Sequence, residues 1–123
     1  MIKILVVDND GELNRNIKLN LEETHQYEVK TVTNGQDALE IACDFHPDLI
    51  LLDIMLPGMP GDQIAAQLKE RKETENIPVI FITGLAGKGN GKLHYNGNVP
   101  ENILTKPFNV PTLINRIDQA LAA

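Results

Sequence analysis

Residues 49–58 have the sequence LILLDIMLPG. Four consecutive apolar residues, Leu49 to Leu52, stand between a Pro-Asp pair and the charged residue Asp53, which a Pro-Gly turn follows. An apolar run of this length predicts a short strand that is buried on both faces, as in a parallel sheet. Asp53 then lies at the carboxyl end of that strand, where open parallel sheets bind their ligands. Taken alone, an Asp at this position could serve only to start the turn.

Further strands alternate with helices on both sides of this segment. Apolar runs predict strands at 2–7, 77–82 and 102–105. At 28–33, Val29 and Val32 alternate imperfectly with polar residues, which predicts a strand on an edge of the sheet. Helices are predicted to begin at Asp10, at Asn34, after the turn at 57–61 and at Asn109. The first helix should bury a ridge of Leu13, Ile17 and Leu21. The alternation predicts an α/β fold, a doubly wound five-stranded parallel sheet with helices on both faces.

Polar residues follow four of the predicted strands, and they are Asp8, Asp53, Thr83 and Lys106. The carboxyl ends of parallel strands lie on one edge of a sheet, so these side chains should converge although they are far apart in the sequence. Turn formation alone does not account for that coincidence. We therefore interpret Asp53 as a functional residue.

The converging groups suit phosphoryl chemistry on a carboxylate. Asp8, Asp53 and the amide of Asn9 supply oxygen atoms of the kind that Mg²⁺ prefers. A divalent cation offsets charge, and an Asp carboxylate then becomes a nucleophile toward a phosphoryl group. The Thr83 hydroxyl and the Lys106 ammonium provide a hydrogen-bond donor and a cation for the oxygens of that group. The set predicts formation of an aspartyl phosphate.

With these residues the chain resembles a known family, the receiver domains of two-component response regulators. Four segments carry the resemblance: Ile4–Asp8, Asp48–Gly58, Pro78–Thr83 and Lys106–Phe108. The resemblance implies that residues 1–123 form one CheY-like receiver domain with a flavodoxin-like sheet of strand order 2-1-3-4-5. It also implies a cis peptide bond between Lys106 and Pro107.

The resemblance also implies roles for the site residues. Asp53 accepts a phosphoryl group from a sensor histidine kinase or a phosphotransfer protein, and the change switches a surface that binds a downstream protein. Asp8, Asn9, Asp53 and the Met55 carbonyl hold Mg²⁺ or Mn²⁺. Thr83 binds a phosphoryl oxygen, and Lys106 pairs with the phosphoryl group. Such a domain is not an enzyme toward other substrates, because it catalyses only its own phosphorylation and slow self-dephosphorylation.

Two site positions depart from the family pattern. Receivers usually carry two adjacent acids after the first strand, and Asn9 stands in the place of the second. We therefore expect weaker Mg²⁺ binding than usual, with Asp10 a geometrically poor substitute. Ile103 stands where receivers commonly place an aromatic switch residue, which indicates an atypical subgroup without that residue.

The glycine-rich stretch at 84–98 is a third departure. It occupies the place of the family's fourth helix, and its glycines predict that this helix is weak or absent. We expect the stretch to become ordered when Asp53 is phosphorylated. The apolar residues Met55 and Leu85 cannot orient water, so self-dephosphorylation should be slow.

Composition limits the partners and the compartment. A net charge of −6 argues against direct nucleic-acid binding by this domain. No apolar run is long enough to span a membrane, and the chain opens on a predicted strand, so we expect a cytoplasmic protein without a signal peptide. The single Cys43 excludes an internal disulfide, and we expect its thiol to be buried.

Two alternatives stay open. A receiver fold that works as a phosphorylation-independent interaction module is favoured by Asn9 alone. Residues 6–11, VVDNDG, also resemble the opening motif of haloacid-dehalogenase-type phosphatases, in which Asp8 is the nucleophile and Asp10 the acid. Against the phosphatase, the chain lacks the late acidic pair of that family, is short for its fold and leaves the strand before Asp53 unexplained.

Overall fold

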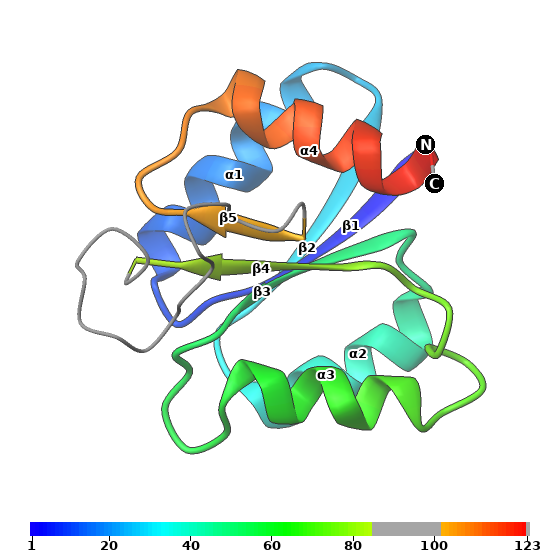
Figure 1. The fold of residues 1–123 in the computed structure, drawn as a ribbon. Coiled ribbons are helices and arrows are strands. Elements are labelled where there is room, and N and C mark those ends of the chain that lie inside the picture. The colour runs from blue at the N-terminus through cyan, green and yellow to red at the C-terminus, as the bar shows by residue number, and fades with distance from the viewer. Residues whose placement is uncertain (85–101, 123) are drawn as a thin grey trace.

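Five parallel strands form one sheet in the order β2-β1-β3-β4-β5 within the described part of a computed structural model, residues 1–84 and 102–122 (Figure 1). The strands are β1 (Ile2–Val7), β2 (Tyr27–Val32), β3 (Leu49–Asp53), β4 (Val79–Thr83) and β5 (Ile103–Thr105). The helices are α1 (Gly11–Glu23), α2 (Gly35–Phe45), α3 (Gly61–Lys69) and α4 (Val110–Ala122). This order and the parallel pairing confirm the predicted doubly wound fold.

Helices cover both faces of the sheet. α1 and α4 lie on one face, and α2 and α3 lie on the other (Figure 1). In β3, Leu49 and Leu51 pack toward α1 and α4, whereas Ile50 and Leu52 pack toward α2 and α3. Each of these four side chains is at most 1% exposed. The apolar run that predicted the strand therefore contributes to two cores at once, as expected for a central parallel strand.

The strand register brings the carboxyl ends of the strands to one level. Val7 of β1 pairs with Leu52 of β3, and Asp53 pairs with Ile82 of β4. Thr83, the last residue of β4, pairs with Thr105 of β5. Polar residues that end a strand, or follow it by one position, therefore lie along one edge of the sheet.

Some predicted boundaries differ by one or two residues. β2 begins at Tyr27, because this ring is buried in the core and is only 2% exposed. β4 begins at Val79 and not at Ile77, since Pro78 has no N–H to contribute to the ladder. The prediction of a weak or absent helix at 84–98, with its ordering on phosphorylation, falls outside the described residues except for Gly84.

One predicted ridge is only partly confirmed, and one predicted burial, that of Cys43, is wrong. In α1, Asn14 is buried together with Ile17 and Leu21, while Leu13 is only half-buried. A polar residue therefore occupies a position where the helical period predicts an apolar one. Cys43 is half-buried because its neighbour Ala42 faces the core.

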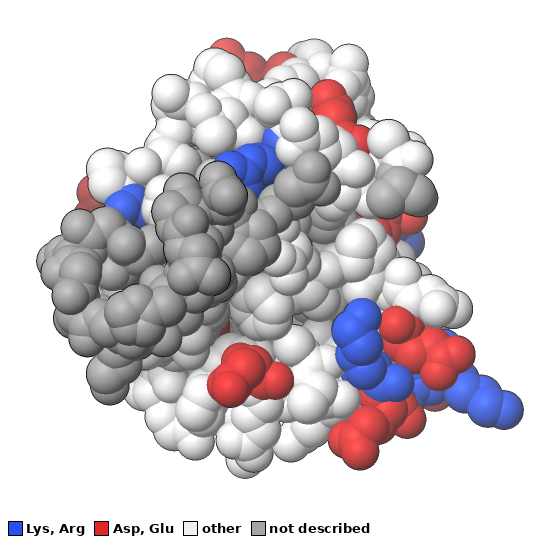
Figure 2. Space-filling view, viewed as in Figure 1, with Lys and Arg blue, Asp and Glu red and all other residues white. Residues whose placement is uncertain are grey.

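Charged side chains gather at one end of the face shown in Figure 2, over the segment that follows α3. Residues 69–75 carry six exposed charged side chains, three of each sign. This end lies opposite the carboxyl ends of the strands, and its mixed charge gives no continuous basic surface there. No helix within 1–84 or 102–122 is long and apolar enough to cross a membrane.

Candidate functional site

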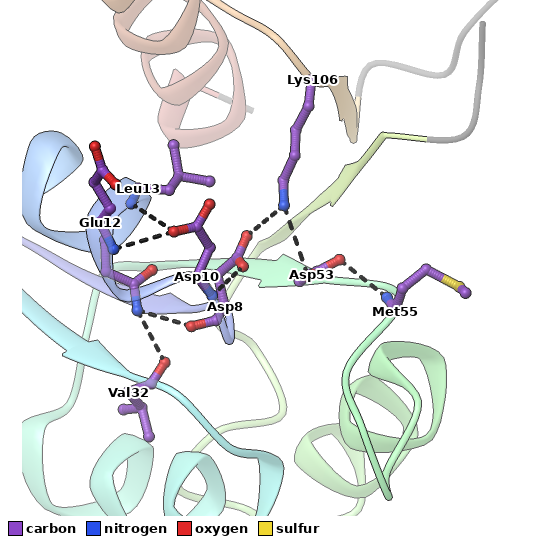
Figure 3. A network of polar contacts seen from close by, with 9 residues as sticks. Asp8, Asp10, Glu12, Leu13, Val32, Asp53, Met55 and Lys106 are labelled. Atoms are coloured by element: carbon purple, nitrogen blue, oxygen red, sulfur yellow. Dashed lines mark hydrogen bonds and ion pairs between the residues drawn. The ribbon is translucent and has the colours of Figure 1, made fainter. Parts of the chain in front are cut away.

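An ion-pair cluster joins the carboxyl ends of β1, β3 and β5 (Figure 3). The Lys106 Nζ lies 2.8 Å from Asp8 Oδ2 and 3.7 Å from Asp53 Oδ2. Asp8 is fully buried and Asp53 is 4% exposed, whereas the Lys106 side chain is 28% exposed. The structure therefore brings together three of the residues that the sequence singled out, with the cation nearest to Asp8.

The other predicted site residues border this cluster. Thr83 is fully buried at the end of β4, and its carbonyl oxygen accepts a 2.7 Å hydrogen bond from the Lys106 N–H. Asn9 is exposed in the turn after β1, and Met55 is 56% exposed in the loop after β3. The Lys106–Pro107 peptide bond is cis, as the resemblance implied.

The two carboxylates are held in the same way. Asp8 Oδ1 accepts a 2.9 Å hydrogen bond from the Asp10 N–H, and Asp53 Oδ1 accepts a 3.0 Å bond from the Met55 N–H. In both cases the donor is two residues further along the chain. Each carboxylate therefore has one oxygen fixed by the backbone, and its Oδ2 points toward Lys106 (Figure 3).

Burial sets the protonation behaviour of Asp53. Desolvation raises the pKa of its carboxyl group above the usual range, and the nearby Asp8 charge adds to the rise. The Met55 hydrogen bond and the Lys106 charge act in the opposite direction and do not cancel the effect. The folded state is therefore less stable when the Asp53 carboxyl group is ionised.

Asp10 has a structural role and is not part of the ion-pair cluster of Asp8, Asp53 and Lys106. It is the N-cap of α1, and its Oδ1 accepts hydrogen bonds of 3.1 Å from the Glu12 and Leu13 N–H groups. Such a cap satisfies amides that the first turn of a helix leaves without partners. Asp10 is therefore committed to starting α1.

Gly61 brings α3 against the backbone of the Asp53 strand. Its N–H donates a 2.9 Å hydrogen bond to the Ile54 carbonyl oxygen. A Cβ at this position would collide with the Asp53 carbonyl oxygen and lie 2.8 Å from Ile54 Cα. Glycine is required here by the close approach of two backbones.

The oxygen donors at this edge are few. Within the described ranges, no three His, Cys, Asp or Glu side chains are grouped so that they could hold a metal ion. Asp8, Asp53 and the nearby amide of Asn9 instead give two carboxylates and one neutral oxygen, which suits a cation that keeps several water ligands. A cavity of about 480 Å³ opens beside Lys106, lined also by Asp10, Leu13, Gly84, Pro107 and Phe108.

Two residues near the site were missed in the sequence. Gly61 carries no sequence signal beyond following a Pro, because its importance comes from a contact with another segment. Asn14 did carry a signal, since it lies three residues before Ile17 and seven before Leu21 on the buried side of α1. A buried asparagine on an apolar ridge indicates a specific hydrogen-bonding role.

Comparison with known proteins gives one consistent family. The family described as response regulator receiver domain matches residues 4–118. The chain is 37% identical over 121 residues to the polar-differentiation response regulator DivK of Brucella ovis, and the match covers 98% of each protein.

Solved structures are similar in fold over nearly the whole chain. The chemotaxis protein CheY4 of Vibrio cholerae matches with a TM-score of 0.81 and 24% identity, covering 98% of this chain and 99% of that one. The receiver domain of the sensor histidine kinase PA1611 of Pseudomonas aeruginosa, solved with a magnesium ion coordinated in its active site cleft, has a TM-score of 0.79 and 22% identity. That match covers 99% of this chain and 98% of the other.

Replacing Asp53 by Asn should stabilise the fold at neutral pH. A carboxyl group with a raised folded-state pKa favours folding when protonated, and this contribution is lost as the pH rises through that pKa. Asp53→Asn should therefore unfold at a higher temperature than the wild type at pH 7, and the difference should shrink as the pH falls. The exposed Asp118→Asn variant serves as the control. Equal melting temperatures of the wild type and Asp53→Asn at pH 7 would contradict a raised pKa of the Asp53 carboxyl group.

Gly61→Ala should lower the free energy of unfolding by about 1–3 kcal/mol, because overpacking forces the Asp53–Ile54 backbone or α3 to move. The matched control is Gly11→Ala, where no atom lies within 4 Å of the added methyl group. The control should be neutral or stabilising by up to about 1 kcal/mol. Urea unfolding of both variants tests this, and equal effects would refute the close contact.

Proposed function

Since the chain belongs to the family of response regulator receiver domains, we propose that it signals by accepting a phosphoryl group on Asp53. The proposed donor is a phosphohistidine of a sensor histidine kinase or of a phosphotransfer protein. One observation carries this proposal: Asp53 Oδ1 is fixed by the Met55 N–H, while Oδ2 lies 3.7 Å from the Lys106 ammonium. Oδ2 is thus the oxygen that can act as nucleophile.

The proposed reaction is an in-line displacement at phosphorus. A lone pair of Asp53 Oδ2 forms the new O–P bond, the P–N bond to the donor imidazole breaks, and its electrons remain on that nitrogen. The Lys106 ammonium and the Thr83 hydroxyl stabilise the charge on the phosphoryl oxygens. The Lys106 ammonium already lies near the acceptor oxygen, Asp53 Oδ2. It therefore needs to move only from Asp8 toward the transferred phosphoryl group.

We propose that Asp8, Asn9, Asp53 and the Met55 carbonyl hold Mg²⁺ or Mn²⁺. When bound, the ion supplies positive charge that offsets the negative charge of the acceptor and of the phosphoryl oxygens. The donors fit such an ion, because two carboxylates and neutral oxygens leave room for the water ligands that Mg²⁺ retains. Asp10 is not part of this set, since its carboxylate caps α1.

Weak metal binding follows from the charges of this site. Asn9 contributes no charge, so Asp8 and Asp53 give −2 and Lys106 returns the total to −1. Asp8 Oδ2, a proposed metal ligand, also carries the shorter ion pair with Lys106. A divalent cation must compete with this ammonium for the same oxygen.

The alternatives are less well supported. In the phosphatase reading Asp10 would be the acid, but its carboxylate accepts two backbone hydrogen bonds at the start of α1. A phosphorylation-independent module does not require the Lys106 ammonium to face both carboxylates. The family match supports a signalling receiver rather than a phosphatase.

The proposal also covers the signalling output. Phosphorylation switches a surface that binds a downstream protein, and the chain acts on no other substrate. The apolar Met55 side chain, exposed beside the acceptor, favours slow self-dephosphorylation because it cannot orient a water molecule. A histidine kinase takes its phosphoryl group from ATP. We therefore propose that the reaction takes place in the cytoplasm, where ATP is available.

Acetyl phosphate with Mg²⁺ should add the mass of one phosphoryl group to the wild-type protein and none to Asp53→Asn. Intact-mass spectrometry measures this, with Asp44→Asn, exposed on α2, as a variant that keeps the gain. No gain in the wild type at high Mg²⁺ would favour the phosphorylation-independent module. A gain that survives in Asp53→Asn would point to Asp8 and the phosphatase reading.

Asn9→Asp should lower the Mg²⁺ concentration needed for half-maximal phosphorylation by about tenfold, since one more charged ligand contributes about 1.4 kcal/mol or more. Asp10→Asn is the matched control, because Asn remains a good N-cap and Asp10 is no ligand in this account. Titration of Mg²⁺ against all three proteins makes the comparison. The same half-maximal concentration for Asn9→Asp and the wild type would be incompatible with the proposed ligand set.

A further inference from the structure

Asn14 is a buried polar residue that the proposed reaction does not use. It is 2% exposed and lies on the ridge of α1 that also carries Ile17 and Leu21. Its Oδ1 has no hydrogen-bond partner among the described residues. A buried oxygen without a partner destabilises the folded state, so this asparagine is a poor choice for packing alone.

The amide group of Asn14 holds the end of β1. Its Nδ2 donates hydrogen bonds to the Asp8 carbonyl oxygen at 2.8 Å and to the Val32 carbonyl oxygen at 3.4 Å. The pairing of β1 with both neighbouring strands ends at Val7, so Asp8 lies one residue beyond the last paired position. The Val32 carbonyl oxygen also accepts a 3.1 Å hydrogen bond from the Asp8 N–H, whereas for the Asp8 carbonyl oxygen Asn14 supplies a donor beyond the paired residues of β1.

The same residue closes the turn between β1 and α1. The Asn14 N–H donates to the Asp10 carbonyl oxygen at 3.0 Å, and the Asp10 N–H donates to Asp8 Oδ1 at 2.9 Å. Asn14 is therefore bonded to both ends of the Asp8–Asp10 turn. With the Asp8 carbonyl and Oδ1 both held, the direction of Asp8 Oδ2 is fixed (Figure 3).

We infer that Asn14 is a positioning residue for the metal site, which orients Asp8 Oδ2 by holding the Asp8 carbonyl oxygen. This inference rests on the proposed function and adds a residue to its machinery. The position of Asp8 matters more in this chain because Asn9 offers only a neutral oxygen, so that Asp8 and Asp53 supply all the negative charge of the proposed metal ligands. Groups that orient a metal ligand typically change metal affinity by 10–100-fold.

The test measures Mn²⁺ binding to the unphosphorylated protein by the EPR signal of the free ion. Asn14→Ala should raise the dissociation constant by roughly 10–100-fold. Asn14→Ser, which keeps a shorter donor, should fall between Asn14→Ala and the wild type, and it carries the test if Asn14→Ala does not fold. Asn16→Ala, at an exposed position of α1, should bind like the wild type.

A further control separates positioning from stability. Ile17→Val removes a methyl group from the same buried ridge and leaves the hydrogen bonds of Asp8 in place. It should therefore have a lower melting temperature than the wild type and still bind Mn²⁺ with wild-type affinity. Folded Asn14 variants with wild-type affinity would overturn the inference while leaving the proposed function intact. A wild type that binds no Mn²⁺ would overturn the proposed metal site and this inference together.

Discussion

A single ammonium group, that of Lys106, keeps two buried carboxylates together at the end of this sheet. Asp8 and Asp53 are almost completely removed from water, and two such charges without a cation would repel each other and lose their hydration. Lys106 lies 2.8 Å from one and 3.7 Å from the other, and it is the cation that the described residues supply to this pair. β5 pairs with β4 and not with β1 or β3, but the Lys106 side chain that follows it reaches across to Asp8 after β1 and to Asp53 at the end of β3.

The surrounding backbone restricts both carboxylates to one orientation. An N–H two residues further along the chain holds Oδ1 of each, which leaves Oδ2 for Lys106 and for the chemistry we propose. Asp10 and Asn14 hold the turn after β1, and Gly61 sets α3 against the strand of Asp53. The raised pKa of Asp53 costs stability, and so does the Asn14 oxygen, which has no hydrogen-bond partner within residues 1–84 and 102–122, as is usual where a fold carries a function.

Much of this arrangement could be predicted from the sequence. The run Leu49–Leu52 predicted a strand buried on both faces, and the parallel topology predicted that Asp8, Asp53 and Lys106 meet at one edge. The preference of Lys106 for Asp8 over Asp53 could not be predicted, because it depends on a difference of about 1 Å between two distances, 2.8 Å and 3.7 Å. Gly61 was missed because its importance lies in a contact with the Asp53–Ile54 backbone, and Asn14 was missed although its place on the buried side of α1 gave a signal. The period of α1 correctly identified a buried ridge, but it did not show that Asn14, next to Leu13, is buried as a hydrogen-bond donor.

A double-mutant cycle of Asp8→Asn and Lys106→Met tests most directly whether Lys106 is the group that makes the buried carboxylates tolerable. Urea unfolding gives the free energy of each of the four proteins. The account predicts that Lys106→Met is strongly destabilising in the wild type and much less so beside Asp8→Asn, with a coupling energy of about 1–3 kcal/mol. Effects that add to within about 0.5 kcal/mol would contradict it, because they would show that the two charges fold independently of each other.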